Sequence, residues 1–274
     1  MPSSSREKYE SLKSILLSYE SVLVAFSGGA DSALVAKAAR DVLGRQRMTA
    51  ATSRSESLPR KEISEVESFV RRYDIRHLWI ETRELENPNY AANPVTRCYF
   101  CKSELYTRMS RLTGKLGLKT MADGTNADDL SDFRPGLQAA AEREVKSPLA
   151  EAGLHKTEIR EISKSLGLST WDKPAAPCLS SRIPYGQSVT AAKLRQIDAG
   201  EAVLKGHGFR IVRVRHFGRA AGIEVGPEEL DRFSSEPRLG AEISSKVRAL
   251  GFESVKIESR GYHKGKFHDS RNQA

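Results

Sequence analysis

The sequence predicts an α/β protein, in which a doubly wound parallel sheet is followed by a smaller C-terminal α+β domain. Short apolar runs at residues 22–26, 48–52 and 77–80 alternate with helical stripes at 33–43 and 59–73. Repeated βα units of this kind form parallel sheets, whose ligands lie beyond the carboxyl ends of the strands. After residue 186 the pattern changes to helix, strand, strand, helix and strand.

The first domain is predicted to span residues 1–186. A polar helix over residues 1–20 precedes the first strand, and Gly44 is placed to end the helix over 33–43. Residues 81–96 contain two Asn-Pro pairs, so we expect a long loop there. Beyond it the pattern indicates a helix over 98–116, strands over 120–122 and 145–149, and a helix over 156–166.

The second domain is predicted to span residues 187–274. Prolines and a glycine within residues 171–186 indicate a loop, which we take as the domain boundary. The remainder predicts a helix over 190–205, strands over 210–216 and 220–225, a helix over 227–250 interrupted near Pro237, and a strand over 254–258.

Composition indicates a globular protein of the cytoplasm. The 274 residues include 44 Lys and Arg and 35 Asp and Glu, giving a net charge of +9. No apolar run approaches a membrane span, and residues 1–20 lack the apolar core of a signal peptide. The basic balance suits RNA and a small phosphorylated substrate equally well. Three cysteines are too few for a disulfide scaffold and point to metal or redox chemistry.

The first strand runs directly into the turn Ser27-Gly28-Gly29-Ala30-Asp31-Ser32, and a helix follows. This arrangement directs several backbone N–H groups at one point, which suits a phosphate. Gly28 and Gly29 allow a ligand to approach the backbone, Ser27 and Ser32 offer hydroxyls, and Asp31 can hold Mg²⁺. The alternative is an ordinary strand-to-helix turn.

The three cysteines leave several sites open. Cys98 and Cys101 form a Cys-x-x-Cys pair, and Cys178 lies in the proline-rich loop. Structural zinc would need a histidine as fourth ligand, and a thioredoxin-like dithiol would need another βαβ context. Three thiolates can hold a [4Fe–4S] cluster with one iron open to a sulfur ligand. Unrelated buried thiols are the remaining alternative.

The C-terminal domain contains a second candidate anion site. Arg213 and Arg215 alternate with valines and therefore share one face of a strand, about 6–7 Å apart. Two guanidinium groups so placed can bind a phosphate, although an exposed strand face explains the pattern as well. Glu201 falls on the apolar stripe of its helix, where a carboxylate needs a metal cation or an arginine. Glu224 in the next strand is either another such partner or an exposed edge residue.

Five segments together resemble the LarE family of the ATP pyrophosphatase (PP-loop) superfamily, whose fold is adenine nucleotide alpha hydrolase-like. They are the loop at 27–32, Asp-Gly-Thr-Asn-Ala-Asp-Asp at 123–129, Phe-Arg-Pro-Gly at 133–136, Cys-Leu-Ser-Ser-Arg-Ile-Pro-Tyr-Gly at 178–186, and Val-Arg-Val-Arg at 212–215. The match extends over nearly the whole chain.

The resemblance implies an ATP-dependent sulfurtransferase of nickel-pincer nucleotide biosynthesis. It would adenylylate the carboxylates of pyridinium-3,5-biscarboxylate mononucleotide, release pyrophosphate, and convert them to thiocarboxylates by displacing AMP. The sulfur would come from Cys178 itself or from a [4Fe–4S] cluster on Cys98, Cys101 and Cys178. The source of sulfide for the cluster is not indicated.

The same resemblance assigns roles to the other candidate residues. Ser27 to Ser32 and Gly124 would bind ATP, Asp31 would bind Mg²⁺ and act in catalysis, Arg213 and Arg215 would bind the substrate phosphate, and Glu201 is a further candidate metal ligand. The family also implies a homo-oligomer.

Two other functions remain open. An iron–sulfur tRNA thiolase shares the loop and three cysteines, but tRNA is not expected because the chain has no separable RNA-binding module. An amide-forming synthetase of the NAD or GMP synthetase type would use ammonia as the nucleophile, and its activity would not depend on the cysteines.

Overall fold

The computed structural model describes residues 3–131 and 134–263, and the chain divides into two compact units. Unit 1 comprises Met1–Asn87 and Thr96–Ala176, and unit 2 comprises Pro88–Val95 and Pro177–Ala274. The division therefore falls before the expected boundary at 186, and a short segment of the N-terminal half belongs to unit 2. Backbone hydrogen bonds explain this difference, because Ala91 and Asn93 bind Val189 and Gly186 respectively.

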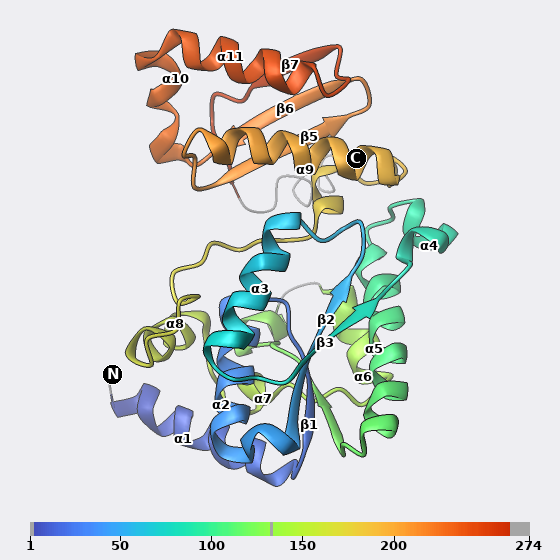
Figure 1. The fold of residues 1–274 in the computed structure, drawn as a ribbon, viewed down its shortest axis with the longest axis vertical. Helices are drawn as coiled ribbons and strands as arrows, with labels where there is room; N and C mark the ends of the chain where they lie inside the picture. The colour runs from blue at the N-terminus through green and yellow to red at the C-terminus, as the bar shows by residue number, and fades with distance from the viewer. Residues whose placement is uncertain (1–2, 132–133, 264–274) are drawn as a thin grey trace. The chain divides into compact units, whose positions relative to one another are not determined.

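Unit 1 contains a parallel four-stranded sheet in the order β3-β2-β1-β4 (Figure 1). The strands are β1 (Val22–Ala25), β2 (Met48–Arg54), β3 (His77–Glu81) and β4 (Thr120–Ala122). In the centre, Val24 of β1 pairs with Ala50 on one side and Ala122 on the other. The carboxyl ends of all four strands therefore meet at one edge of the sheet.

Helices cover both faces of this sheet, so the doubly wound prediction is confirmed. Val22 and Val24 belong to a core shared with α1 (Ser3–Ser18), α2 (Ala30–Arg47), α3 (Arg60–Arg72), α7 (Pro148–Glu151) and α8 (Lys156–Ser165). Leu23 and Ala25 point to the opposite core, which contains residues of α5 (Arg97–Leu116) and α6 (Pro135–Ala141). This alternation follows from the two-residue period of a strand.

Some expected elements of unit 1 differ from the structure. The strand expected over 145–149 is wrong, because Lys146 forms only an isolated bridge to Ala122 and Pro148 begins α7. Proline lacks an N–H for a strand ladder but suits the first turn of a helix. The expected loop over 81–96 contains the 3₁₀ helix η1 (Glu84–Glu86) and α4 (Pro88–Ala91). Gly44 interrupts α2 with φ = 75°, although the helix resumes to Arg47.

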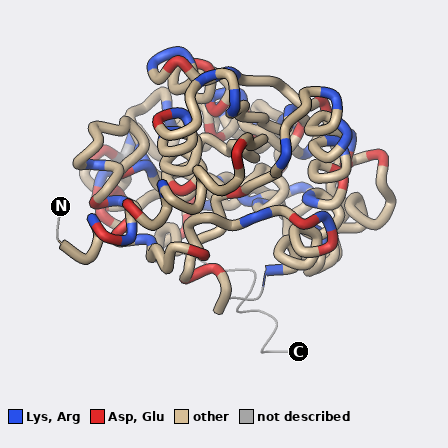
Figure 2. The backbone as a smooth tube through the Cα atoms, turned by 90° about the horizontal axis from the view of Figure 1, so that it is seen from below, with Lys and Arg blue, Asp and Glu red and all other residues tan. Residues whose placement is uncertain are grey.

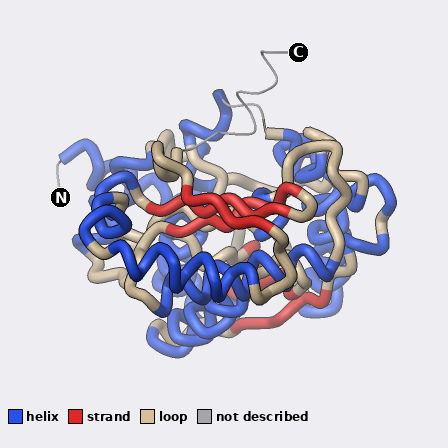
Figure 3. The backbone as a smooth tube through the Cα atoms, turned by 90° about the horizontal axis from the view of Figure 1, so that it is seen from above, coloured by secondary structure: helices blue, strands red, loops and turns tan. Residues whose placement is uncertain are grey.

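Unit 2 is built on a three-stranded sheet in the order β5-β6-β7. All strands of the protein are red in Figure 3. The strands of the unit 2 sheet are β5 (Val212–Phe217), β6 (Ala220–Val225) and β7 (Ser254–Ile257). Apolar residues of all three strands form one core with α9 (Ala191–Gly206) and α11 (Pro237–Arg248). Four smaller helices complete the described part of the unit: α4 (Pro88–Ala91), η3 (Leu179–Arg182), η4 (Pro227–Glu229) and α10 (Asp231–Ser235).

The helix expected over 227–250 is broken as its proline predicts, since α10 ends at Ser235 and α11 begins at Pro237.

Basic and acidic residues are interspersed along the described backbone (Figure 2). Within the part of the chain that the structure describes, none of the helices is both long and apolar enough to cross a membrane.

Candidate functional site

The Ser27–Ser32 loop follows β1 at the carboxyl edge of the unit 1 sheet. Gly28 has φ = 73°, Gly29 is the N-cap of α2, and Asp31 and Ser32 lie in the first helical turn. The Ser32 hydroxyl accepts a hydrogen bond from the Ser27 N–H (3.1 Å), donates to the Gly29 carbonyl (3.2 Å), and lies 3.1 Å from the Ser27 hydroxyl. The two serines thus stabilise the turn, and the backbone N–H groups at the N-terminus of α2 have no acceptor within the helix.

A side chain would be crowded at two glycines of this site. A Cβ atom on Gly28 would lie 3.1 Å from Val66 Cγ2, and its positive φ also disfavours other residues. A Cβ atom on Gly124, which follows β4, would lie 2.8 Å from the Ser32 nitrogen. Gly124, expected at the nucleotide site, therefore packs directly against the first turn of α2.

Asp31 lies beside the turn that follows Gly124. Its Oδ1 accepts a 3.4 Å hydrogen bond from Asn126 Nδ2, and its Oδ2 contacts Lys156 Nζ. Asn126 is buried, and its Oδ1 accepts hydrogen bonds from the N–H groups of Asp128 and Asp129. Burial raises the pKa of Asp129, and the charge of Asp31 adds to this shift.

The oxygen donors around Asp31 have the hard character that Mg²⁺ prefers. Asp31 and Asp129 are carboxylates and fit a magnesium site, whereas Asn126 presents its amide nitrogen to Asp31 and uses its oxygen to accept from the N–H groups of Asp128 and Asp129. Across residues 3–131 and 134–263, however, no group of three or more His, Cys, Asp and Glu side chains is arranged to hold a metal ion.

Lys173 is a residue of this region that sequence reasoning missed. Its Nζ donates to the Gly28 carbonyl (3.0 Å) and to Glu62 Oε2 (2.6 Å), and it lies 2.7 Å from Glu65 Oε2. Burial lowers the pKa of Lys173, but its bonds to the two glutamates outweigh this effect and raise the pKa overall. Because Gly28 is 145 residues away along the chain, no local pattern indicated the contact.

Asp123, the first residue of the 123–129 segment, is buried and serves as an internal acceptor. It accepts hydrogen bonds from the hydroxyls of Tyr106 (2.8 Å), Thr125 (3.0 Å) and Ser147 (3.1 Å). Burial raises the pKa of Tyr106 to about 12, and its hydroxyl accepts from Lys102 Nζ at 2.8 Å. Asp123 therefore fixes the turn that carries Gly124 and Asn126.

Cys98 and Cys101 lie in the first turn and a half of α5, after the N-cap Thr96. Cys98 is exposed and Cys101 is half-buried. Residues three apart share one face of a helix, so the structure brings these two positions together, and the positive end of the helix favours thiolates. Phe133 of the 133–136 segment lies outside the described residues.

Cys178 belongs to unit 2, where it is half-buried and directly precedes η3. Arg182, at the end of η3, forms a buried pair with Glu201 of α9, with Nε–Oε1 and Nη2–Oε2 distances of 2.7 and 3.0 Å. Glu201 Oε1 also accepts a 3.3 Å hydrogen bond from the Val214 N–H. We expected either a metal cation or an arginine as the partner of Glu201, and the structure has an arginine.

Arg213 and Arg215 are both buried, so the alternative of an exposed strand face is wrong. Arg215 donates to Glu224 Oε2 (2.9 Å) and to the Ser181 carbonyl (2.9 Å). The Arg213 guanidinium lies 4.6 Å from the centre of the Tyr262 ring. Burial lowers the pKa of Arg213, and the neighbouring charge of Arg182 lowers it further. Glu224 is fully buried and not an exposed edge residue.

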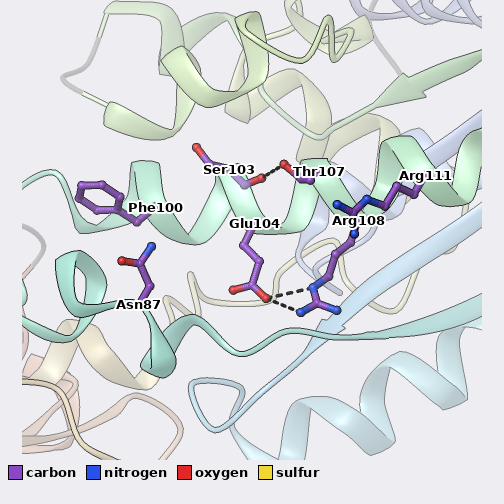
Figure 4. A pocket seen from close by; sticks show the side chains of 7 residues that line it. All are labelled: Asn87, Phe100, Ser103, Glu104, Thr107, Arg108 and Arg111. Carbon is purple, nitrogen blue, oxygen red and sulfur yellow. Dashed lines mark hydrogen bonds and ion pairs between the residues drawn. The ribbon is translucent and has the colours of Figure 1, made fainter.

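A pocket of about 350 Å³ lies elsewhere in unit 1, along one side of α5. Figure 4 shows Glu104 and Arg108 joined by an ion pair in this pocket, with Asn87 of the preceding segment opposite Phe100. None of the candidate residues named above lines the pocket. We therefore place the candidate site at the sheet edge rather than in this pocket.

Comparisons with known proteins agree with these features. The model of the NAD synthase family matches residues 9–92, which include the Ser27–Ser32 loop. An uncharacterised protein of Synechocystis sp. is 45% identical over 94% of this chain and 96% of its own. An uncharacterised protein of Methanocaldococcus jannaschii is 31% identical over 62% of this chain and 65% of its own.

A third relative has a named activity. The pyridinium-3,5-bisthiocarboxylic acid mononucleotide synthase of Lactiplantibacillus plantarum is 32% identical over 97% of this chain and 96% of its own. The similarity thus extends over both units. The chain belongs to the LarE family of PP-loop enzymes.

Proposed function

We propose that this protein is an ATP-dependent sulfurtransferase that converts pyridinium-3,5-biscarboxylic acid mononucleotide to its bisthiocarboxylic acid. The observation that carries the proposal is the Ser27–Ser32 loop, which includes Asp31, at the N-terminus of α2 in a chain related over nearly its whole length to a named synthase of that product.

The first step is adenylylation. A substrate carboxylate oxygen attacks the α-phosphorus of ATP, a new P–O bond forms, and the bond to the β-phosphate oxygen breaks to release pyrophosphate. First-turn amides of α2 and the hydroxyls of Ser27 and Ser32 would bind the phosphates. Asp31 would hold Mg²⁺, which offsets charge on the departing pyrophosphate. Gly124 keeps this first turn in place through its close packing.

Arg213 and Arg215 would bind the phosphate of the mononucleotide. Their burial favours this role, because charged hydrogen bonds are stronger where water is excluded. Such binding would orient the carboxylate for both steps. Glu201 would act through its pair with Arg182, and a metal ligand role for it has no support from its contacts.

The second step is sulfur transfer. In the cysteine route the Cys178 thiolate attacks the carbonyl carbon, a C–S bond forms, and AMP leaves with the electrons of the C–O bond. Cleavage of the Cys178 Cβ–S bond with loss of the Cα proton then gives the thiocarboxylate and dehydroalanine. In the other route Cys98, Cys101 and Cys178 would hold a [4Fe–4S] cluster, because three thiolates can serve as its protein ligands. The cluster would then supply the sulfur.

The proposal extends to a cytoplasmic homo-oligomer with a small-molecule nucleotide substrate. The interspersed charges of Figure 2 fit such a substrate as well as they fit RNA. A tRNA thiolase and an amide-forming synthetase are therefore retained as outcomes of the test rather than as equal proposals.

The test is anaerobic ATP–pyrophosphate exchange with the full chain, offered the mononucleotide in one assay and bulk unmodified tRNA in another. We expect exchange with the mononucleotide alone. Exchange with tRNA alone would overturn the proposal, and so would mononucleotide-dependent amide formation from ammonia that survives replacement of all three cysteines by alanine.

A matched pair of variants tests the role of Asp31. Asp31→Asn should reduce exchange by about a hundredfold or more. Asp41 lies on the same helix and forms an exposed pair with Lys37. Asp41→Asn should therefore leave the exchange rate within about twofold of wild type. Equal rates in the two variants would remove Asp31 from the mechanism.

A further inference from the structure

The segment Pro88–Val95 belongs to unit 2 although both of its flanks belong to unit 1. It consists of α4 and an irregular stretch that contains Asn93. Its contacts reach the chain just after Cys178, between Ser180 and Val189. Only Thr96 and Arg97 separate its end from Cys98 in the sequence.

Asn93 is completely buried and has φ = 57°, a conformation that asparagine adopts more readily than most residues. Its side-chain amide donates to three carbonyl oxygens, those of Ile183 (3.3 Å), Pro184 (2.8 Å) and Gln187 (3.0 Å). Its own carbonyl accepts from the Gly186 N–H at 3.0 Å. Asn93 thus binds four residues of the opposing loop, three through its side chain and one through its backbone carbonyl.

Two further bonds bracket the same loop. The Tyr90 hydroxyl lies 2.7 Å from the Ser180 hydroxyl, and both side chains are buried. The Val189 N–H donates to the Ala91 carbonyl at 2.8 Å. The segment therefore holds the loop from Ser180 to Val189.

The start of the loop is tied to the same structure through Arg182. Its Nη1 donates to the carbonyls of Pro177 (2.6 Å) and Cys178 (3.1 Å), while its other nitrogens bind Glu201. Arg182 immediately precedes Ile183, whose carbonyl binds Asn93. The position of the Cys178 backbone thus depends on bonds that run from Asn93 through the loop to Arg182.

We propose that Asn93 is a positioning residue for Cys178, and that it acts by preventing local opening of residues 178–189. The part of this inference that concerns sulfur transfer rests on the proposed function, whereas the part that concerns the Cys178 thiol does not. The three side-chain bonds of Asn93 described above lie within unit 2.

Three variants separate this role from a general loss of structure. Asn93→Asp places an oxygen where the amide donates to three carbonyls, and Asn93→Gly keeps the positive φ but has no donor. Tyr90→Phe removes the hydroxyl that bonds to Ser180. Asn89→Asp is the control, because Asn89 lies in the same short helix and its side chain is exposed.

The primary measurement is the rate of alkylation of each cysteine by iodoacetamide in the intact protein, with the sites assigned by peptide mass spectrometry. We expect Cys178 to react about tenfold faster in both Asn93 variants and to a lesser degree in Tyr90→Phe, because lost buried hydrogen bonds raise the population of the open loop. Cys98 is the internal reference and should change by less than about twofold, as should every site in Asn89→Asp.

The second measurement compares ATP–pyrophosphate exchange with thiocarboxylate formation. We expect exchange to stay within about threefold of wild type in the Asn93 variants while thiocarboxylate formation falls about tenfold. Unchanged alkylation of Cys178 would overturn the positioning role, and so would equal losses in exchange and sulfur transfer. Should Asn93→Asp fail to fold, Asn93→Gly and Tyr90→Phe decide the question by the same criteria.

The two proposals can fail separately. Absence of exchange in the wild-type protein with the mononucleotide would refute the proposed function, while the alkylation rates would still decide whether Asn93 holds Cys178. Faster alkylation with unaltered sulfur transfer would refute a positioning role in the reaction itself.

Discussion

Replacement of Gly124 by alanine tests how the sheet edge positions the phosphate loop. The added Cβ would lie 2.8 Å from the Ser32 nitrogen, closer than such atoms approach without a bond, and 3.0 Å from the Ser32 Cα, which is also a tight contact. Both contacts are with backbone, so the first turn of α2 or the turn after β4 must move. Overpacking of this kind costs about 1–3 kcal/mol.

The same displacement should weaken nucleotide binding. The Ser32 N–H is one of the first-turn amides that have no helical acceptor, since the first helical bond runs from the Ala33 N–H to the Gly29 carbonyl. Misplacing this donor should lower ATP-dependent exchange by between about tenfold and a hundredfold. The melting temperature should fall by roughly 4–8 °C for a cost of ~2 kcal/mol.

The control is Gly114→Ala in α5, where an added Cβ has no neighbour within 4 Å. It should stabilise the protein by up to ~1 kcal/mol through helix propensity and leave exchange unchanged. Calorimetry and exchange assays on both variants suffice. Gly124→Ala with wild-type stability and exchange would refute the close packing as the reason for a glycine at this position.

Three further changes have defined outcomes. Lys173→Met should lower the free energy of unfolding by about 2–4 kcal/mol and exchange by at least ~10-fold, because Glu62 and Glu65 lose their cation and Gly28 its donor. Glu201→Gln should cost about 3–5 kcal/mol in urea unfolding by leaving the buried charge of Arg182 without a counter-ion. Burial lowers the pKa of His77 from 6.5 to about 4, so the unfolded chain binds a proton first as the pH falls. Wild type should therefore lose about 1–2 kcal/mol relative to His77→Gln between pH 7 and pH 4.5, with the difference absent above about pH 7.5.

Each of these expectations has a control and a contrary result. Lys61→Met removes a more exposed partner of Glu65 and should change stability by less than ~1 kcal/mol, so equal effects at both lysines would contradict the role of Lys173. Glu253→Gln removes an exposed pair with Arg219 and should have a similarly small effect, against which Glu201→Gln is judged. A pH-independent difference between wild type and His77→Gln would mean that His77 titrates alike in both states.

The sequence predicted those parts of the molecule that depend on local patterns. The strands and helices of the doubly wound sheet followed from two-residue and 3.6-residue periods, and the loop at 27–32 from its glycines and its place between strand and helix. The strand expected over 145–149 was wrong because the prediction followed its apolar residues rather than Pro148, which suits the start of a helix better than the inside of a strand. Only the bridge at Lys146 remains of it.

Contacts between distant residues could not be predicted in the same way. Lys173 lies in a proline-rich loop, and nothing near it in the sequence indicates Gly28 or Glu62 as partners. Glu201 could be identified as a buried carboxylate by its place on an apolar stripe, but whether its partner was a metal or Arg182 required the fold. Asn93 was noticed only as part of an Asn-Pro pair, which is a turn signal and says nothing about the loop it binds.

The path of the chain through Pro88–Val95 has a consequence for dissecting this protein. The polypeptide passes between the two units three times, after Asn87, after Val95 and after Ala176, so no single cut separates them. A C-terminal fragment beginning at Pro177 would contain every strand of the unit 2 sheet but none of the donors of Asn93, and we expect its first residues to be frayed. Joining Pro88–Val95 to the N-terminus of that fragment through a flexible linker should restore those bonds. Such a restoration would show that the second unit includes these eight residues as well as the chain from Pro177.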